Sequence, residues 1–522
     1  MTKKHYQKKR TYYQTPDFDS GMLPEPLLSF GGRHEHVDPK VGLGLYGPYT
    51  LAGQTRPPLT SIVVGLIGPS AMLADAQQWL DACSGTITND GQQPFLHPHF
   101  PGFNANYPYQ CTLIHGDTWR ESIKIDHLNE ALAIGNFYER VKKVVALYIK
   151  GIEILAQRDP KPSVILCCIP DEVIELCTVA TKHGGEIKRI RKSKSEKDAE
   201  KIALTGQMFM FSDMDPFSSM ADDETGHNNL RRGIKAEAMQ FGIPTQLVWP
   251  RTLELSSDSK KTQDVATRAW NFTTALYYKA GGFPWRISQM DPGNCFVGVS
   301  FYKEIHEENP RMRTSMAQAF TSAGDGYVLR GNPFEWNEQH GSSPHIDAKG
   351  AAALIGDVID MYKRQNRGSL PNRLVVHKTS RFWEEELEGF RDSSSIVPRV
   401  DFVTLGWRGI QFYRTGDYPP VRGTYVKFSS TEMALYTNGY IPFLRTYPGA
   451  RAPKPLEILE HHGDSPWNLV LEEILALTKM NWNTADFATS EPITTAFSRK
   501  VGSVLAELPT NLPMRPEYRF YM

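Results

Sequence analysis

The sequence predicts an α/β protein made of two consecutive units. The chain has 522 residues, and one hydrophobic core rarely serves more than about 250 to 300 residues, so two or three domains are expected. Strand and helix patterns alternate through the first half, up to the Gly-Pro break GGFPW at 281–285. The second half places several strands in a row before helices that can cover them. Alternation favours a parallel sheet between helix layers, and grouped strands favour a sheet covered by helices.

The first unit opens its alternation with SIVVGLIG at 61–68, an apolar run typical of a buried strand. Residues 128–157 repeat apolar side chains at three- and four-residue spacing, which predicts one long amphipathic helix. The other elements expected in this unit are helices at 75–84, 171–182, 226–241 and 262–280 and strands at 163–170 and 245–249. This order of strands and helices is typical of a Rossmann-like fold.

The second unit begins with the apolar run NCFVGVSFY at 294–302, which predicts a strand. Further expected elements are strands near 312–321, 326–330 and 372–380, several strands up to residue 446, and helices at 347–365, 381–391, 467–478 and 493–507. Strands in a row with covering helices fit an RNase H-like layer. We therefore expect an N-terminal arm at 1–40 that lies on a surface, a Rossmann-like domain at 41–290 and an RNase H-like domain at 291–522.

Composition narrows the classes of protein to consider. Lys plus Arg and Asp plus Glu both total 58, so only local clustering of charge can make a surface for a polyanion. The six cysteines have no paired spacing, and Cys167 and Cys168 lie inside an apolar run. This pattern predicts reduced core residues in a cytoplasmic protein. No apolar run reaches the roughly 18 residues that a membrane span needs.

Several segments with familiar patterns are not expected to be sites. GLGLYG at 42–47 spells G-x-G-x-x-G, but no strand pattern precedes it and two consecutive prolines follow. An unrelated nucleotide-binding enzyme stays as an alternative only if this motif begins a helix. The histidines at 34–36, 97–99 and 461–462 lack the spacing of a tetrahedral metal site. The charge-dense segment 186–201 is expected to be a solvated loop or an exposed helix.

A cationic helix edge is the strongest candidate for a binding site. In RRGIKAEAMQFGIPTQ, residues 231–246, Arg231 and Lys235 are four residues apart and share one helix face beside an apolar stripe. Gln246 lies on the strand that follows, and Lys279 ends another predicted helix just before two glycines. Three elements could then converge at one edge of the sheet, where α/β folds bind phosphates. The alternative is an ordinary solvated helix surface.

These segments resemble the MID-to-PIWI passage of Argonaute proteins. The resemblance runs through RRGIKAEAMQFGIPTQLV, AWNFTTALYYKAGGFPW, CFVGVS, GDGYVLRG, RLVVHKTSRFWEEE, YPPVRGTYVKF, LYTNGYIP and LALTKMNWNTADF, in that order. HVDPKVGLGLYGP and FPGF near the start agree with it. A full-length Argonaute would need N and PAZ domains as well. The chain is therefore similar to the short prokaryotic Argonautes, with a MID domain at 41–290 and a catalytically inactive PIWI domain at 291–522.

The resemblance implies a pocket for the 5′-phosphate of a guide strand. On the matching positions, the phosphate would be held by Arg231, Lys235, Gln246 and Lys279, because charge-assisted hydrogen bonds contribute about 1.5 to 3 kcal/mol each. The family also places its C-terminal carboxylate, here that of Met522, against this phosphate with a divalent cation, which implies a structural Mg²⁺. Arg231 stands where an aromatic residue or His is often found, so stacking on the first guide base stays open.

The resemblance also bears on nuclease activity. Cleavage of the RNase H type needs clustered carboxylates that hold two Mg²⁺ ions about 4 Å apart. Family members that cut place Asp at two positions where this sequence has Ser300 and Thr379. We therefore predict no catalytic residues and a chain that binds a guide–target duplex without cutting it, with an active guide-directed endonuclease as the alternative. Candidate contacts to the nucleic-acid backbone are Lys378, Arg381 and Arg499, with exposed charges that only maintain solubility as the alternative.

Partners and a biological role are implied in the same way. Short Argonautes pair a guide RNA with a single-stranded DNA target and form a heterodimer with an APAZ-containing effector protein. That effector commonly carries a TIR or Sir2 domain that hydrolyses NAD, and less often a nuclease. The expected setting is the cytoplasm of a prokaryote, in defence against plasmids or phage, with higher oligomers on activation and no membrane contact. Enzymatic activity is then expected in the partner chain.

Overall fold

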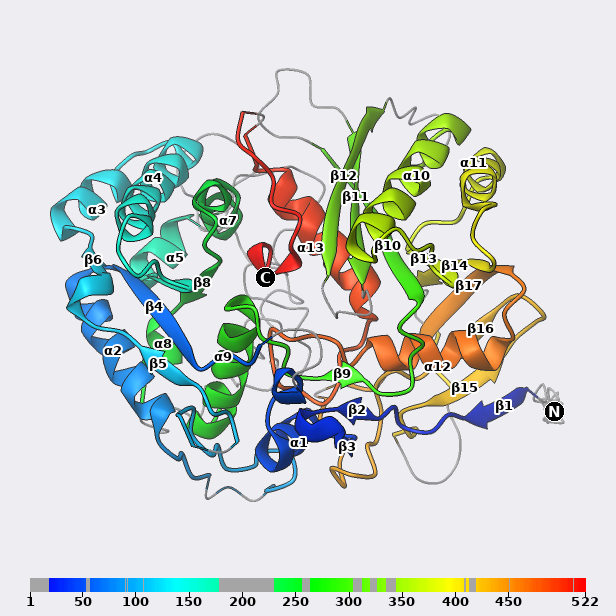
Figure 1. The fold of residues 1–522 in the computed structure, drawn as a ribbon, viewed down its shortest axis with the longest axis horizontal. Coiled ribbons are helices and arrows are strands. Elements are labelled where there is room, and N and C mark those ends of the chain that lie inside the picture. The colour runs from blue at the N-terminus through cyan, green and yellow to red at the C-terminus, as the bar shows by residue number, and fades with distance from the viewer. Residues whose placement is uncertain are drawn as a thin grey trace, which may run out of the picture.

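The computed structural model describes residues 18–522, apart from 53–56, 90, 92, 107, 178–229, 256–262, 304–311, 320–325, 335–343, 408–409, 413–418, 450 and 510. Two lobes lie side by side, each built on its own sheet, and the C-terminal end lies between them (Figure 1). The charge-dense segment at 186–201 and the first four residues of the helix predicted at 226–241 fall outside the described residues.

The first lobe holds a parallel sheet in the order β5-β4-β7-β8, with β6 also paired to β4. Its strands are β4 (Ser61–Gly68), β5 (Thr112–Ile114), β6 (Arg120–Ser122), β7 (Val164–Cys168) and β8 (Thr245–Val248). Its principal helices are α2 (Ser70–Ser84), α4 (Phe137–Ala156), α7 (Leu230–Ala238) and α9 (Val265–Lys279). Apolar side chains of β4 and β7 enter two separate core clusters, one with α2 and α9 and one with α4 and α7. The predicted Rossmann-like sheet between helices is confirmed.

The second lobe is built on a nine-stranded sheet in the order β1-β15-β16-β17-β14-β13-β10-β11-β12. The parallel strands are β10 (Asn294–Lys303), β13 (Arg373–Lys378) and β14 (Val400–Gly406). The antiparallel ones are β1 (Asp19–Met22), β11 (Met312–Ala319), β12 (Tyr327–Phe334), β15 (Thr424–Lys427), β16 (Met433–Leu435) and β17 (Leu456–Gly463). The helices that cover the sheet are α10 (Ala348–Gln365) and α11 (Glu384–Ser394) on one face and α12 (Trp467–Leu477) and α13 (Ile493–Leu505) on the other. This arrangement matches the RNase H-like expectation.

The structure corrects elements in both lobes, and the short strands β5 and β6 of the first lobe were not predicted. The helix predicted over 128–157 is two helices, α3 (Ile125–Leu132) and α4. The break comes from Asn136, whose side chain accepts hydrogen bonds from the first backbone amides of α4 and so caps its start. Strand β17 was not predicted at all. Its sequence LEILEHHG carries two Glu and two His, so its apolar pattern is interrupted.

The N-terminal arm lies against both the second lobe and the segment that joins the lobes. β1 pairs with β15 at the edge of the large sheet, and β2 (Leu28–Ser29) pairs with β9 (Arg286–Ile287) between the lobes. The Glu25 carboxylate lies 3.0 Å from Arg422 and 2.7 Å from Lys479. Burial acts to raise the pKa of Glu25, but these two cations hold it below its usual value. Of the arm predicted at 1–40, the part from residue 18 onward lies on a surface of this same chain.

All six cysteines are buried and unpaired, as the sequence predicts. Burial raises the pKa of the Cys167 thiol to about 12, so this group is a protonated core residue at neutral pH. Within the described ranges, we find no helix that is both long and apolar enough to cross a membrane.

The GLGLYG motif at 42–47 lies within and just after helix α1 (Pro39–Tyr46). That helix begins at Pro39, where the Asp38 side chain accepts a hydrogen bond from the Val41 amide. The motif's glycines therefore occupy the body and the C-terminal end of the helix. A dinucleotide-binding fingerprint needs its first glycine in the turn that precedes a helix, so this geometry does not match one.

Candidate functional site

Helix α7 places the first two predicted cations beside the core of the first lobe. Leu230, Ile234 and Ala238 are buried in the cluster beneath the helix, as their spacing predicts. Lys235 is only 3% exposed, and its Nζ donates a hydrogen bond of 3.0 Å to the backbone oxygen of Thr245 at the start of β8. Lys235 thus joins the helix to the strand that carries Gln246.

Lys279, the last residue of α9, lies at the centre of the candidate site. Its side chain is fully buried, and its Nζ donates to the Gln246 Oε1 atom at 2.5 Å and to the Asn483 Oδ1 atom at 3.5 Å. Asn483 belongs to the second lobe. The structure therefore brings Gln246 and Lys279 together as predicted, and it adds an amide from the other lobe.

The electrostatic surroundings of Lys279 are positive. Burial, together with the nearby charges of Arg231 and Lys500, lowers the pKa of Lys279 to about 7. Lys500 lies on α13, so α7, α9 and α13 each contribute a cation. A buried ammonium with amide partners and cationic neighbours is an arrangement that favours the binding of an anion.

The C-terminal segment passes between the two lobes close to this cluster (Figure 1). The Arg515 side chain donates a hydrogen bond of 3.1 Å to the Met239 backbone oxygen, just after α7. On the other side, the Tyr518 ring stacks on Phe497 of α13 with centroids 3.3 Å apart. Met522 is buried in a hydrophobic core cluster to which both lobes contribute.

Ser300 and Thr379 each lie just past the point where the parallel pairing of β10 with β13 ends. The register pairs Val299 of β10 with Lys378 of β13, so Ser300 and Thr379 each follow that pair by one residue. Ser300 is partly buried and Thr379 is exposed. In the part of the chain that the structure describes, no three His, Cys, Asp or Glu side chains are grouped so that they could hold a metal ion.

The predicted backbone contact of Lys378 needs correction. Its side chain is fully buried, pairs with the equally buried Glu386 and lies 5.3 Å above the centroid of the Phe382 ring. A nucleic-acid backbone at the surface could not reach this ammonium in the observed conformation. The sequence pattern could not reveal this, because the partner Glu386 is eight residues away on a separate helix.

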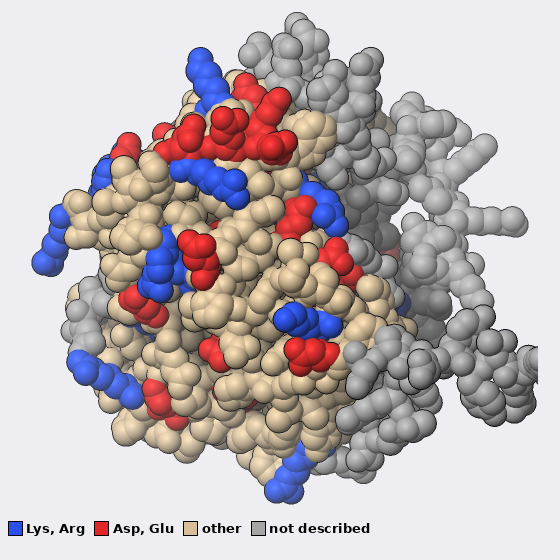
Figure 2. Space-filling model, turned by 90° about the vertical axis from the view of Figure 1, so that its right-hand side faces the viewer, with Lys and Arg blue, Asp and Glu red and all other residues tan. Residues whose placement is uncertain are grey.

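Arg381 and Arg499 are exposed, but both are engaged with acids of the second lobe. Arg381 lies 2.9 Å from Glu460, and Arg499 lies 2.6 Å from Glu491. Across the outer face of this lobe, Lys and Arg side chains lie interspersed with Asp and Glu (Figure 2). The described part of that face thus carries mixed charge. Contact of the two arginines with a nucleic-acid backbone stays a prediction.

Two residues of the candidate site were missed from the sequence. Asn483 and Lys500 both belong to the second lobe and lie more than 200 residues after Lys279 in the chain. Asn483 lies inside LALTKMNWNTADF, a segment that resembles the family, but neither residue has a local pattern that indicates a contact with Lys279. Only the packing of the two lobes brings them there.

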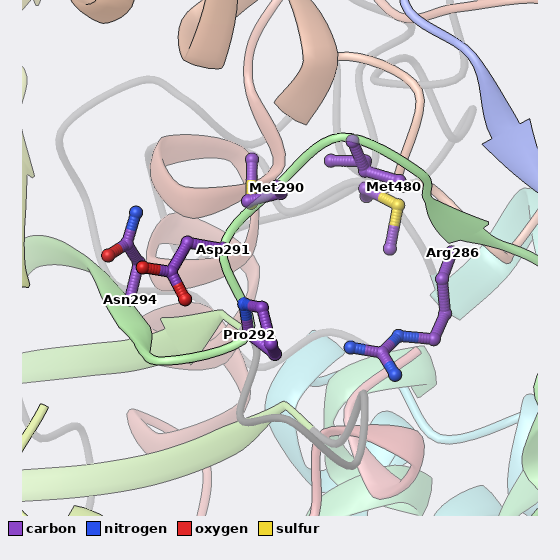
Figure 3. A pocket seen from close by; sticks show the side chains of 7 residues that line it. Arg286, Met290, Asp291, Pro292, Asn294 and Met480 are labelled. Carbon is purple, nitrogen blue, oxygen red and sulfur yellow. The ribbon is translucent and has the colours of Figure 1, made fainter. Parts of the chain in front are cut away.

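A small pocket elsewhere at the junction contains none of the predicted residues. It is lined by Arg286 and Met480 on one side and by Met290, Asp291, Pro292 and Asn294 on the other (Figure 3). One base and one acid face it, so its charges cancel. It therefore lacks the excess of positive charge that surrounds Lys279.

The comparisons with known proteins agree with this architecture. A curated Argonaute protein of Aquifex aeolicus is 21% identical over 279 residues, which is 52% of this chain and 35% of that protein. An Argonaute of Cereibacter sphaeroides is 24% identical over 302 residues, 52% of this chain and 37% of that protein. The chain is thus similar to Argonaute proteins over about half of its length. No family model matches it.

Solved Argonaute structures share the fold across nearly the whole chain. A Clostridium butyricum Argonaute bound to a guide DNA and a 19-mer target DNA matches with a TM-score of 0.59 and 16% identity, over 95% of this chain and 54% of that one. The A. aeolicus Argonaute matches with a TM-score of 0.55 at 14% identity, over 96% and 55%. Drosophila Piwi matches with a TM-score of 0.53 at 12% identity, over 96% and 56%. The chain thus has the MID-PIWI fold and spans about half the length of these Argonautes.

Proposed function

We propose that this chain binds a guide strand by its 5′-phosphate and presents it to a complementary target. The observation that carries the proposal is the buried Lys279 ammonium, which has amide partners and lies near Arg231 and Lys500. A terminal phosphate would supply the negative charge that these groups favour. Lys235 and Gln246 would orient the pocket from α7 and β8. Base pairing would then read the target sequence, while the protein holds the end of the guide.

The proposal includes binding without cleavage. Ser300 and Thr379 offer neutral hydroxyl groups at the two positions where the family's cutting members have Asp, and hydroxyls cannot balance two divalent ions. Guide-loaded protein incubated with Mg²⁺ and a complementary target should therefore leave the target intact. A specific cut that is absent from guide-free protein would establish the alternative, an active endonuclease.

The only Mg²⁺ that we propose is a structural ion bound beside the guide phosphate. The side chains around Lys279 fit an anion, and the described ones form no carboxylate cluster for a divalent cation. Any Mg²⁺ would need the Met522 carboxylate together with the phosphate oxygens as ligands. Chelation with EDTA should then weaken guide binding less than the loss of Lys279 does.

We further propose a guide RNA, a single-stranded DNA target and an APAZ-containing effector partner. The RNA guide and the effector partner rest on the resemblance to short prokaryotic Argonautes. The C. butyricum Argonaute, which is bound to a guide DNA and a target DNA, supports a guide strand and a DNA target. The effector, with a TIR or Sir2 domain that hydrolyses NAD, would supply the chemistry in defence against plasmids or phage. Co-purification from the native host tests this, by sequencing the bound nucleic acid and identifying the bound protein.

The phosphate pocket is tested by the double variant Lys235→Ala with Lys279→Ala. We expect it to lose retention of a 5′-phosphorylated guide while its thermal unfolding still shows a folded protein. The control variant is Lys124→Ala, which removes an exposed lysine at the start of α3. A guide with a 5′-hydroxyl should bind the wild type weakly as well. Unchanged affinity of the double variant for the phosphorylated guide would refute the pocket.

A further inference from the structure

A short segment of the second lobe connects the N-terminal arm to the candidate phosphate site. This segment, residues 479–483, begins just after α12 ends at Leu477. At its far end, the Asn483 Oδ1 atom accepts a hydrogen bond of 3.5 Å from the Nζ atom of Lys279. That distance is at the long limit of a hydrogen bond, so a small displacement of the segment would break the contact.

The near end of the segment is held by the arm. Lys479 Nζ lies 2.7 Å from the Glu25 carboxylate and donates a hydrogen bond of 2.7 Å to the Val37 backbone oxygen. Glu25 also lies 3.0 Å from Arg422, whose guanidinium donates a hydrogen bond of 2.8 Å to the Thr478 hydroxyl at the end of α12. Both cationic side chains are fully buried, and a buried charge needs a partner of the opposite sign. Glu25 therefore fixes the point where the segment begins.

The middle of the segment is packed against the first lobe and the junction. The Trp285 Nε1 atom donates a hydrogen bond of 2.8 Å to the Lys479 backbone oxygen, and the Trp482 Nε1 atom donates one of 3.2 Å to the Trp285 oxygen. The Trp482 ring also packs against Tyr278 of α9, with centroids 4.6 Å apart. Both tryptophans are fully buried. Because close-packed interiors transmit displacements, a shift at one end of the segment would reach the other end.

We propose that Glu25 is a positioning residue of the phosphate pocket. It holds Lys479, and the packed segment that follows places Asn483 where its oxygen accepts from Lys279. A hydrogen bond to the ammonium orients it and favours its charged form, which is the form that attracts a phosphate. This inference rests on the proposed function, because it concerns the same pocket. The arm thus contributes to guide binding from outside the pocket.

Equilibrium binding of matched guides that carry a 5′-phosphate or a 5′-hydroxyl tests the proposal on the full chain. The measured quantity is the ratio of the two affinities, because a protein that is merely loosened binds both guides less well and keeps the ratio. Lys479→Met removes the link to the segment while Glu25 keeps its pair with Arg422. We expect this variant to lower the ratio by about threefold to tenfold, the range for one hydrogen bond.

A double-mutant cycle tests whether the effect passes through Asn483. Asn483→Ala should lower the ratio by a similar factor, and its combination with Lys479→Met should lower it no further, since both changes act on one contact. Losses that multiply in the double variant would overturn the proposed route. Glu25→Gln keeps the size of the side chain and removes its charge, and it should lower the ratio as Lys479→Met does.

The matched control is Lys378→Met, which removes the other partner-bound buried lysine of the same lobe. It should lose stability and keep the ratio. If the wild type does not prefer the phosphorylated guide, the phosphate pocket and this inference are both wrong. If the wild type prefers that guide and Lys479→Met prefers it equally, only the role of Glu25 is wrong. A higher ratio in Asn483→Ala would mean that Asn483 competes with the phosphate, which would also overturn the proposal.

Discussion

Two buried lysines, one in each lobe, have their ammonium groups stabilised by different kinds of partner. Lys279 and Lys378 are both fully buried and both end a secondary-structure element. Lys378 pairs with the carboxylate of Glu386, whereas Lys279 donates to the amide oxygens of Gln246 and Asn483. A buried cation with its own carboxylate is complete within the fold. A buried cation with only amide partners is not neutralised within the fold, so an external anion can neutralise it. The partner of a buried lysine therefore indicates a binding role better than its position in the fold does.

The pKa shifts express the same difference. Burial lowers the pKa of both lysines, but the Glu386 charge acts to raise that of Lys378. For Lys279, Arg231 and Lys500 act in the same direction as burial, and its pKa falls to about 7. Each lysine can therefore be tested by what happens when its charge is removed.

The largest expected effect is on stability, at Lys378. Substitution Lys378→Met should lower the free energy of unfolding by about 3 to 5 kcal/mol, because Glu386 would be left buried without a partner. Urea denaturation of the purified variant measures this loss. The double variant Lys378→Met with Glu386→Met should recover much of it, since both charges then disappear together. If Lys378→Met were as stable as the wild type, Lys378 would not be needed to neutralise Glu386, and the proposed difference between the two lysines would be wrong.

The next effect is a pH dependence of stability that originates at Lys279. Between its pKa of about 7 in the fold and its ordinary value of 10.5, the unfolded chain binds more protons at this group than the folded chain. Its contribution to the free energy of unfolding should therefore rise with pH across this window, by up to about 1.4 kcal/mol per pH unit. Urea denaturation at pH 7, 8 and 9 should show a steeper rise in the wild type than in Lys279→Met. Parallel curves for the two proteins would contradict the assignment.

Guide affinity should change with pH in the opposite sense. If the charged form of Lys279 holds the 5′-phosphate, affinity for a phosphorylated guide should weaken between pH 7 and 9, by less than about tenfold per pH unit because the bound phosphate favours the charged lysine. Equilibrium binding of 5′-phosphate and 5′-hydroxyl guides, measured in parallel, isolates this effect. The same slope for both guides would place the titrating group elsewhere.

The smallest effects are expected at the exposed arginines of the second lobe. Arg381→Ala and Arg499→Ala each break an ion pair with a neighbouring acid, and exposed pairs of this kind contribute about 0 to 1 kcal/mol. Each variant should change duplex affinity by less than about fivefold, mostly through the dependence on salt. Filter binding at 50 and 200 mM salt measures both quantities. A loss comparable to that of the Lys279 variant would make these arginines part of the principal site.

Much of the fold followed from patterns that are local in the sequence. The strands β4, β7 and β10 are apolar runs, and the helices α9 and α10 have clear periodicity and N-terminal Asp caps. The incorrect predictions arose where two local sequence patterns indicated different structures. Asn136 interrupts a continuous apolar stripe with a cap, and the polar residues of β17 conceal a strand that pairs on both sides.

The candidate site was predictable only where it is carried by the first lobe. Gln246 and Lys279 were identified through their positions at the sheet edge and through resemblance, and the structure joins them directly. Asn483 and Lys500 come from the other lobe, and Lys378 was assigned to the surface because its buried partner was not visible in the sequence. Contacts between elements far apart in the chain are set by packing, which no single-segment pattern encodes.

The ion pairs of Glu25 with Arg422 and Lys479 have a consequence for biosynthesis. The partners of Glu25 lie about 400 residues later in the chain. Strand β1 likewise pairs with β15, which is about as far away in the sequence. During translation the arm leaves the ribosome well before the second lobe does, but it can reach its place only after most of that lobe has been made. Contacts of such long range slow folding and leave intermediates exposed. The arm, although made before both lobes, is thus among the last of these parts to be fixed.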